Sequence, residues 1–346
     1  MLTPGIPNCS QVSDMLVFDL TPMRQATMLV WLVGMPVIMV LGTFGNIMIL
    51  LIQRREYSSS HSSMSILFTC LAISDLTSLW FDPLFWWLEA LDVFIYYSFL
   101  WKIRMFVIYL TGHTSASILV TMTTQKAVSI LWPHRVKVMF TARIAKNLMC
   151  GGLVFFLLIN SHLLYGVTVI LPTNTSTPRC FDMYVSSEYA EFFNNVWGWV
   201  DTFFSSLVPV LLLLVANSVL IRKVGQSLQE ARKRFSTGNA DRLRSREKKT
   251  SSMTVTLIAT SVTFLLLTSP YSVYFVFRER LFAGADKDTD IADANDLAFA
   301  VLHLLWIGNN SVTFYLYCLT GAKYRENFFK ARLSEQSQEA NRREIH

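Results

Sequence analysis

The sequence predicts an all-α membrane protein, a bundle of seven transmembrane helices with a short amphipathic eighth helix. The chain has 346 residues, 52% of them hydrophobic and 16% charged, whereas soluble domains average about 25% charged residues. The apolar residues gather in seven blocks, each near the roughly 20 residues that span a bilayer. Because lipid offers the backbone no hydrogen-bond partner, each block is expected to be helical. The blocks are 26–52, 64–88, 105–124, 147–171, 202–221, 250–277 and 297–322.

The segments outside these blocks complete the predicted organisation. The N-terminal segment is mixed and polar, and one membrane domain follows it. After the seventh block, basic and aromatic residues alternate, and Tyr324, Phe328 and Phe329 share one helical face, which is typical of a helix lying on a membrane surface. The last residues are polar and form a tail. The predicted divisions are 1–25, 26–322, 323–333 and 334–346.

The basic residues predict the topology. Of the 30 Lys and Arg residues, 23 fall in one set of alternate loops and the tail, and seven fall in the other set. Basic residues are enriched on the cytoplasmic side, so the N-terminus is expected outside the cell, with the chain in the plasma membrane. The net charge of +6 follows from this topology, which makes nucleic acid a poor candidate partner.

Two sequons and two cysteines fall on the predicted outer side. Asn8 and Asn174 each begin an Asn-x-Ser/Thr sequence and are candidate glycosylation sites. Cys9 and Cys180 are the two cysteines on this side. The exterior is oxidising and permits a disulfide between them, but the sequence does not tell whether the two residues are close enough.

Six motifs follow one another along the blocks. They are Gly45-Asn46, Leu71-Ala72-Ile73-Ser74-Asp75, Pro133, Pro209, Phe264 with Pro270, and Tyr317. In this order they resemble the motifs of the rhodopsin-like (class A) G-protein-coupled receptors over about residues 26–332. The resemblance implies a signal-transducing receptor with an extracellular ligand, a heterotrimeric G protein and membrane lipid as its partners.

Other motifs of that family are altered. Its Asp-Arg-Tyr appears here as Gln125-Lys126-Ala127, which keeps a positive charge without its acidic neighbour. Its Cys-Trp-x-Pro appears as Leu267-Thr268-Ser269-Pro270, and its Asn-Pro-x-x-Tyr lacks the proline. Trp101 stands where the family has a cysteine. The resemblance is therefore to a divergent member, whose switching is expected to differ.

Asp75 is charged and lies in the middle of the second block. A carboxylate near the bilayer centre costs roughly 2.5–3.5 kcal/mol, so a polar pocket between helices is expected around it. The resemblance implies that Ser115 and Asn309 belong to this pocket, that Asn46 is a nearby partner, and that a sodium ion binds there through oxygen ligands. Thr313 replaces a stronger ligand of the family. A hydrogen-bonded core without an ion is the alternative.

The resemblance also implies switching residues on the cytoplasmic side. Lys126 is expected to face the cavity where a G protein docks, although a simple positive-inside anchor is the alternative. Pro209 and Pro270 predict bends in the fifth and sixth helices. The full set is Gln125, Lys126, Pro209, Phe264, Pro270 and Tyr317.

The predicted outer ends of the helices are aromatic and acidic. Ile108 occupies the position where amine receptors carry an aspartate, and Ile307 that of the retinal-binding lysine, so neither ligand is expected. A short amidated neuropeptide with aromatic and cationic groups fits better, whereas an interfacial aromatic belt is the structural alternative. The ligand-side candidates are Asp82, Trp86, Glu89, Ile108, Trp197, Asp201 and Tyr274.

Two rival functions stay open. One is a seven-helix chemosensory receptor with atypical coupling. The other is a transporter or channel, for which broken helices, repeated halves and several intramembrane charges are expected; the sequence places only Asp75 and Asp82 clearly within spans. His113 and His162 have no metal-ligand spacing to other ligands and are expected to be packing or hydrogen-bonding residues. The sequence has no nucleophile elbow, phosphate loop or zinc motif, so an enzyme is not expected.

Overall fold

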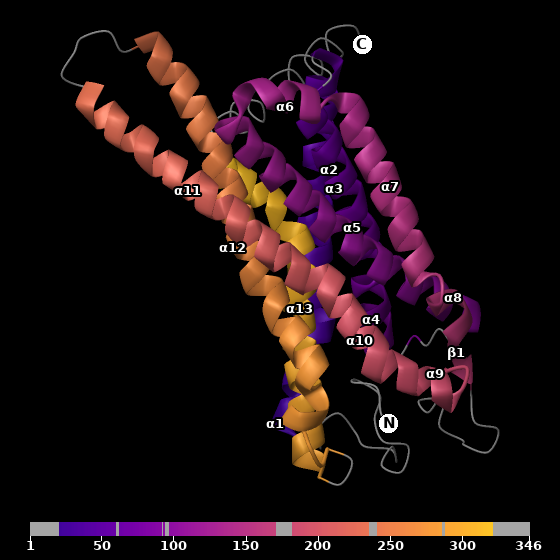
Figure 1. Ribbon diagram of the computed structural model, residues 1–346. Helices are drawn as coiled ribbons and strands as arrows, with labels where there is room; N and C mark the ends of the chain where they lie inside the picture. Colours follow the sequence, from indigo (N-terminus) through magenta and orange to yellow (C-terminus); the bar gives the residue numbers. More distant parts are fainter. Residues whose placement is uncertain are drawn as a thin grey trace, which may run out of the picture.

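The computed structural model describes residues 21–59, 62–91, 93, 97–170, 182–234, 241–285 and 288–320. Figure 1 shows long helices running side by side in one bundle, with α1, α9 and β1 at one end and α6 at the opposite end. Seven helices in the described ranges are long and apolar enough to cross a membrane, so the predicted fold class is confirmed. The predicted eighth helix and tail, the sequons at Asn8 and Asn174, and Cys9 and Cys180 lie outside the described residues.

The first four spans and their connections are built from the following elements. They are α1 (Pro22–Leu29), the π-helical η2 (Val30–Gly34) and α2 (Met35–Ser59); α3 (Ser63–Phe81) and α4 (Pro83–Ala90); α5 (Ser98–Leu131) with the short α6 (Pro133–Met139); and α7 (Ala142–Asn160) with α8 (Leu163–Gly166).

The last three spans and the hairpin before them complete the bundle. They are β1 (Val167–Ile170) and β2 (Asp182–Tyr184); α9 (Ser187–Phe192), η3 (Phe193–Trp197), α10 (Gly198–Thr202), η4 (Phe203–Leu207) and α11 (Val208–Arg234); α12 (Asp241–Leu281); and α13 (Thr289–Thr320). The fifth helix continues well beyond the apolar block and ends at Arg234.

Prolines explain where several spans change geometry. Proline lacks an N–H, and its ring collides with the carbonyl four residues earlier. The π-helical segments η2 and η4 each end two residues before a proline, Pro36 and Pro209, which is a known way of absorbing this conflict. Pro83 separates α3 from α4, and Asp82 lies at the break. In contrast, α12 continues as one helix through Pro270.

The predicted C-terminal end of the fourth apolar block was wrong. The block was expected to be helical to residue 171, but α8 ends at Gly166 and β1 begins at Val167. The segment Val-Thr-Val-Ile is rich in β-branched residues, which favour strands, and it pairs with β2 in antiparallel fashion. The hairpin contacts the third span through a 2.7 Å hydrogen bond between the hydroxyls of Ser98 and Thr168.

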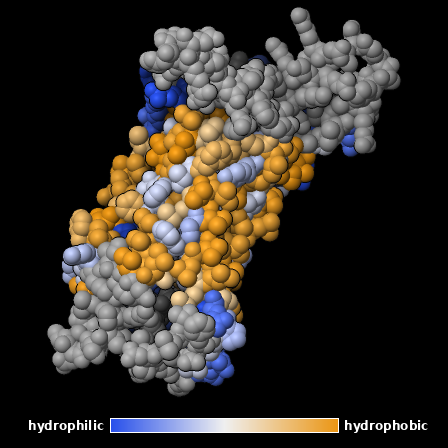
Figure 2. Space-filling view, turned by 180° about the vertical axis from the view of Figure 1, so that it is seen from behind, coloured by the Kyte–Doolittle hydropathy of each residue, from blue (hydrophilic) through white to orange (hydrophobic). Residues whose placement is uncertain are grey.

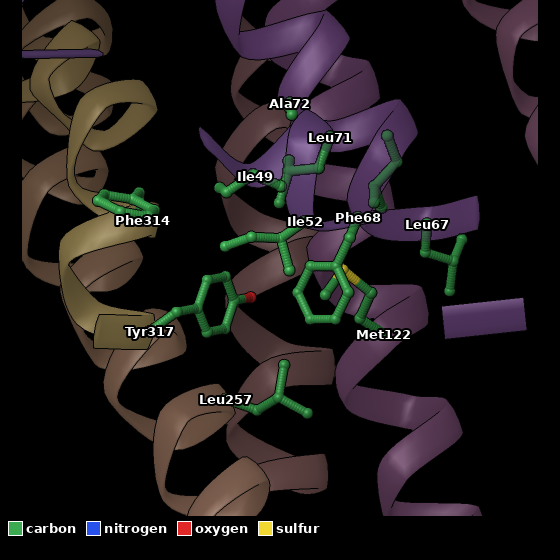
Figure 3. Close-up of a cluster of buried hydrophobic side chains, with 11 residues drawn as sticks. Ile49, Ile52, Leu67, Phe68, Leu71, Ala72, Met122, Leu257, Phe314 and Tyr317 are labelled. Carbon is green, nitrogen blue, oxygen red and sulfur yellow. The ribbon is translucent and has the colours of Figure 1, made fainter. Parts of the chain in front are cut away.

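A cluster of buried hydrophobic side chains lies between five of the spans (Figure 3). Its buried members come from α2, α3, α5, α12 and α13 and are Ile49, Ile52, Leu67, Phe68, Leu71, Ala72, Ile118, Met122, Leu257, Phe314 and Tyr317. The ring of Tyr317 meets that of Phe68 edge to face, with centroids 5.0 Å apart. The predicted switching residue Tyr317 is therefore held in an apolar layer.

The outside of the bundle is apolar over its middle section. On the face visible in Figure 2, hydrophobic side chains cover most of the middle section of the bundle, and hydrophilic side chains lie at its two ends. The exposed apolar residues include Val40, Phe44, Leu158 and Val215. Such a surface is stable in contact with lipid, which supports a multi-pass membrane protein.

Gly42 allows α2, α3 and α13 to approach closely. A Cβ atom added there would lie 2.5 Å from both Leu79 Cδ1 and Ser311 Oγ. We expect Gly42→Ala to lower the free energy of unfolding by about 1–3 kcal/mol, measured by thermal unfolding of the purified chain in detergent. Gly151→Ala is the matched control, because no atom lies within 4 Å of its added Cβ. Equal stability of the two variants would contradict this packing.

Candidate functional site

A cavity lies at the end of the bundle that carries α4, β2 and α9 (Figure 1). Its volume is ≈ 140 Å³, and side chains from the second, third, fifth, sixth and seventh spans line it. The aromatic lining includes Trp86, Trp101, Tyr109, Tyr271, Phe299 and Trp306. The charged and titratable lining consists of Asp82, Glu89, Arg104, Asp201, Arg278 and His303. The cavity thus combines apolar walls with a few polar groups, as ligand sites do.

Asp82, Arg104 and His303 form a buried ionic cluster on one wall of the cavity. Asp82 Oδ1 accepts a 2.7 Å hydrogen bond from Arg104 Nη2, and Oδ2 lies 2.5 Å from His303 Nε2. The side chain of Asp82 is 1% exposed and that of Arg104 is 5% exposed. Since the three residues belong to different spans, the cluster joins the second, third and seventh helices.

Local structure explains how these groups meet. Asp82 lies at the break that Pro83 imposes between α3 and α4, and its side chain is buried in the bundle. The guanidinium of Arg104 lies over the rings of Phe85, Trp86 and Trp101, with 4.3, 5.0 and 5.2 Å to the centroids. Cation–π attraction of this kind is strongest where water is excluded. Phe85 and Trp86 of the second span therefore shield the charge of Arg104 from water.

His113 and Asp201 form a second polar contact that reaches the cavity. His113 Nε2 lies 3.1 Å from Asp201 Oδ1, without the alignment of a good hydrogen bond. His113 is fully buried, its ring stacks on Phe156 at 5.3 Å, and its Nδ1 lies 3.2 Å from the amide nitrogen of Asn160. This contact links the third, fourth and fifth spans.

The ligand-side candidates divide into two groups. Asp82, Trp86, Glu89, Ile108 and Asp201 line the cavity. Trp197 and Tyr274 do not belong to its lining. The first is buried against His162, with ring centroids 4.2 Å apart, and the second donates a 2.8 Å hydrogen bond to Asn295 Oδ1.

The structure brings Asp75 and Ser115 together, as the resemblance implied. Ser115 Oγ donates to Asp75 Oδ1 at 2.8 Å and lies 2.9 Å from Ser74 Oγ. Asp75 is 2% exposed. In the described part of the chain, no ion pair and no second hydrogen bond reaches it, so its buried charge lacks a compensating partner.

The other predicted members of that pocket lie nearby but do not bond to Asp75 in the described ranges. The Asn46 amide donates to the carbonyls of Gly42 and Asn310, at 2.9 and 2.8 Å. Asn309, the residue implied by the resemblance, is half-buried, and Thr313 is buried. The seventh helix therefore meets Asn46 through the backbone of Asn310, one residue further along.

At the far end of the bundle, the altered triplet has a partner on the second span. Gln125 Nε2 donates a 2.7 Å hydrogen bond to Ser63 Oγ, and both side chains are buried. Lys126 is half-buried and forms no ion pair with any described residue. Gln125 thus fastens α5 to the start of α3 and leaves the neighbouring cation available.

The remaining switch residues lie in the core. Phe264 packs with Ala116, Leu119 and Leu213 in a buried cluster between the third, fifth and sixth spans. Pro209 is buried directly after η4, whereas Pro270 is exposed.

Sequence reasoning missed three functional contacts. The third block was expected to begin at residue 105, but α5 begins at Ser98 and places Arg104 inside the helix. His303 was not singled out. The acidic neighbour of His113 was not predicted, because Asp201 lies on another span. A lone Arg and a lone His in otherwise apolar spans were the available signals for Asp82's partners.

Removal of one member of the Asp82–Arg104 pair should be costly. We expect Asp82→Ala or Arg104→Ala to lower the free energy of unfolding by about 3–5 kcal/mol, because each leaves an unpaired buried charge. The double variant should lose less than the sum of the two. Thermal unfolding in detergent measures all three, with Lys102→Ala as a control of similar type on the same helix. Additive losses would show that the pair is not coupled.

Comparison with known proteins agrees with this architecture. The family described as 7 transmembrane receptor (rhodopsin family) matches residues 45–313, which is more than half of the chain. A search of curated proteins returned no matching sequence. The family match spans most of the helices that build the cavity, the Asp75 pocket and the Gln125 contact. The chain therefore belongs to the rhodopsin family of seven-transmembrane receptors.

Proposed function

We propose that this protein is a plasma-membrane receptor that binds a short amidated neuropeptide in its cavity and activates a heterotrimeric G protein. The observation that carries the proposal is the aromatic, charged cavity at one end of a seven-helix bundle of the rhodopsin family. Aromatic walls favour burial of apolar side chains, and the few charges favour orientation.

The orientation with the cavity outside the cell is supported by two features. The cavity end also carries the start of α1, where Arg24 and Thr21 both bond to Asp293 at 2.6 Å. The opposite end carries α6 and the α11 extension, whose sequences are basic. Basic residues favour the cytoplasm. The N-terminus is accordingly proposed to be extracellular.

The size of the cavity bears on the ligand class. Sites that enclose a drug-sized molecule typically measure about 300–1,000 Å³, whereas this cavity measures ≈ 140 Å³. Only part of a larger ligand fits in the conformation described. One end of a peptide, such as an amidated terminal residue, suits this shape, with the rest of the peptide contacting the hairpin and the loops.

Coupling to the G protein is proposed at the opposite end. Ligand binding favours one of two arrangements of the bundle only if the ligand contacts them differently. The α5 helix carries cavity residues at one end and Gln125 and Lys126 at the other. Rearrangement of α5 relative to α3 would break the Gln125–Ser63 bond and expose Lys126 to a partner. The unusual triplet also suits a chemosensory receptor with atypical coupling.

The peptide class is tested by expressing the chain in cells and screening amidated peptides against their free acids. We expect an amidated peptide to evoke calcium or cyclic-nucleotide responses and nucleotide exchange on a G protein. Phe299→Ala removes a ring from the cavity wall and should lower potency about tenfold. Phe203→Ala, on a ring that is 46% exposed on the lipid side, is the matched control. A current or substrate flux without nucleotide exchange would instead indicate a transporter or channel.

We also propose that the Asp75 pocket holds a sodium ion. Asp75 is a buried carboxylate with one neutral hydrogen-bond donor among the described residues, and a buried charge needs compensation. The surrounding groups fit a hard cation, because Ser74 and Ser115 offer oxygen atoms. The ion would be held by Asp75 and Ser115, and it would supply the missing positive charge.

Sodium binding predicts salt-specific stability. Replacing choline by sodium at constant ionic strength should raise the melting temperature of the parent chain. At a sodium concentration ten times the dissociation constant, the free energy of unfolding should rise by about 1.4 kcal/mol. Asp75→Asn should abolish the difference between the two salts. Asp290→Asn removes an exposed acid and should keep it. If the parent melts equally in both salts, Asp75 is satisfied without an ion.

A further inference from the structure

We propose that the cavity binds a positively charged ligand group, an ammonium or guanidinium on an apolar or aromatic body, and that Asp201 is the carboxylate that contacts it. The inference rests on the proposed function, since it takes the cavity as the ligand site. It goes further by selecting one acid of the cavity as the charge contact and by naming the residues that position it.

Asp82, the most buried acid in the lining, is already used. Arg104 and His303 occupy its two oxygens, and the carboxylate is 1% exposed. The rings of Phe85 and Trp86 cover the guanidinium. A ligand cation would have to displace an arginine that is desolvated and already bonded. The free energy lost by breaking that buried pair would exceed the free energy gained from the new contact. Asp82 therefore holds the helices together and does not receive the ligand.

Asp201 has the opposite properties. Its side chain is 19% exposed and lines the cavity, and it accepts no well-aligned hydrogen bond from any described residue. It lies in the five-residue α10, between the π-helical segments η3 and η4. Single π-helical turns within α-helices are frequent at functional sites. Asp201 thus presents a partly solvated carboxylate to the cavity.

The hydrogen bonds of His113 assign its ring proton. The amide nitrogen of Asn160 donates to the carbonyl of Phe156 at 2.7 Å, which fixes the orientation of that amide, because a carbonyl only accepts. The same nitrogen lies 3.2 Å from His113 Nδ1, so Nδ1 is the acceptor and the ring proton is on Nε2. Nε2 lies 3.1 Å from Asp201 Oδ1 without forming a well-aligned hydrogen bond, so the ring packs beside the carboxylate and leaves it open to a ligand.

The rest of the lining supports a cation. Three carboxylates, two guanidinium groups and one histidine line the cavity, and Asp82 is bonded to Arg104 and His303. Tyr271 stacks between Trp306 and Phe275, with centroids 5.4 and 6.2 Å away, and all three rings line the cavity. Ring faces next to a carboxylate stabilise a cation that has lost part of its hydration shell.

The charge preference can be measured without a known ligand. Ser205 lines the cavity one helical turn after Asp201. We would replace it in the full chain by cysteine (Ser205→Cys) and compare the rates at which it reacts with two methanethiosulfonates of similar size, one carrying trimethylammonium and the other sulfonate. The parent chain, treated in the same way, corrects for native cysteines. The cationic reagent should react faster.

Neutralising the carboxylate should remove the preference. A negative potential of one kT at the cysteine raises the rate of the cationic reagent and lowers the rate of the anionic reagent by the same factor. Asp201→Asn should therefore lower the ratio of the two rates about sevenfold for each kT of potential that it removes. Asp201→Glu should keep the ratio, which separates charge from folding. Glu188→Gln, an exposed acid at the start of α9, is the matched control and should leave the ratio unchanged.

His113 and Asn160 act as positioning residues. His113→Ala should reduce the ratio, whereas His113→Gln places an amide N–H near the position of Nε2 and should restore it. A general loss of structure would lower both rates together and not their ratio.

Three results would overturn the inference: a ratio near one in the parent background, a ratio that survives Asp201→Asn, or no reaction with either reagent, since a closed cavity admits no charged ligand. The labelling requires neither peptide nor G protein. A cation-selective cavity in a chain that answers no peptide would therefore remove the proposed peptide class and keep the Asp201 site. A peptide response with no charge selectivity would do the reverse.

Discussion

The structure depends on the compensation of charge inside an apolar bundle. A carboxylate buried among helices is stable only if a cation, a proton or several donors face it. Asp82 meets this requirement within the protein, because Arg104 and His303 come to it from two other spans. The demand for compensation therefore also fixes how the second, third and seventh helices are placed, and it is met at the wall of the cavity, where aromatic rings keep water away.

Three aspartates of the bundle, Asp82, Asp75 and Asp201, show how the same side chain acquires different roles. Asp82 is saturated by two charged or polar partners and is structural. Asp75 has a single neutral donor among the described residues, so its pocket is suited to an added cation. Asp201 is partly exposed, and His113 Nε2 lies 3.1 Å from its carboxylate without a well-aligned hydrogen bond. The burial of each carboxylate and the number of donors that it meets, not the residue type, determine whether it is a structural contact, an ion site or a ligand contact.

The sequence predicted the fold well, because transmembrane helices are specified locally by length and hydrophobicity. It also identified most polar residues that matter, since a charge in an apolar block is conspicuous. It could not pair them. Asp82 and His303 are 221 residues apart, and Asp201 and His113 lie on different spans, so only the packing of the helices brings them together. The boundary errors at Arg104 and Val167 have a related cause: hydrophobicity marks the part of a helix in lipid, whereas caps and strand-forming residues mark its ends.

The third span, α5, is the element through which the two ends communicate in our interpretation. It carries Arg104 and His113 near the cavity, Ser115 at the Asp75 pocket and Gln125 at the far end, and each side chain contacts a different helix or a different level of α3. A continuous helix of 34 residues cannot rotate or shift at one of these levels without straining the others. The layer around Tyr317 separates the levels, and its described members are apolar apart from the Tyr317 hydroxyl. We therefore interpret the rigid helix as the element that transmits a change at the cavity. Because Gln125 replaces an acid here, the last contact in this series is a neutral hydrogen bond, which is weaker than a charge-assisted one. The contact of α5 at the far end is therefore weaker than the charge-assisted contact of Arg104 with Asp82 at the cavity end.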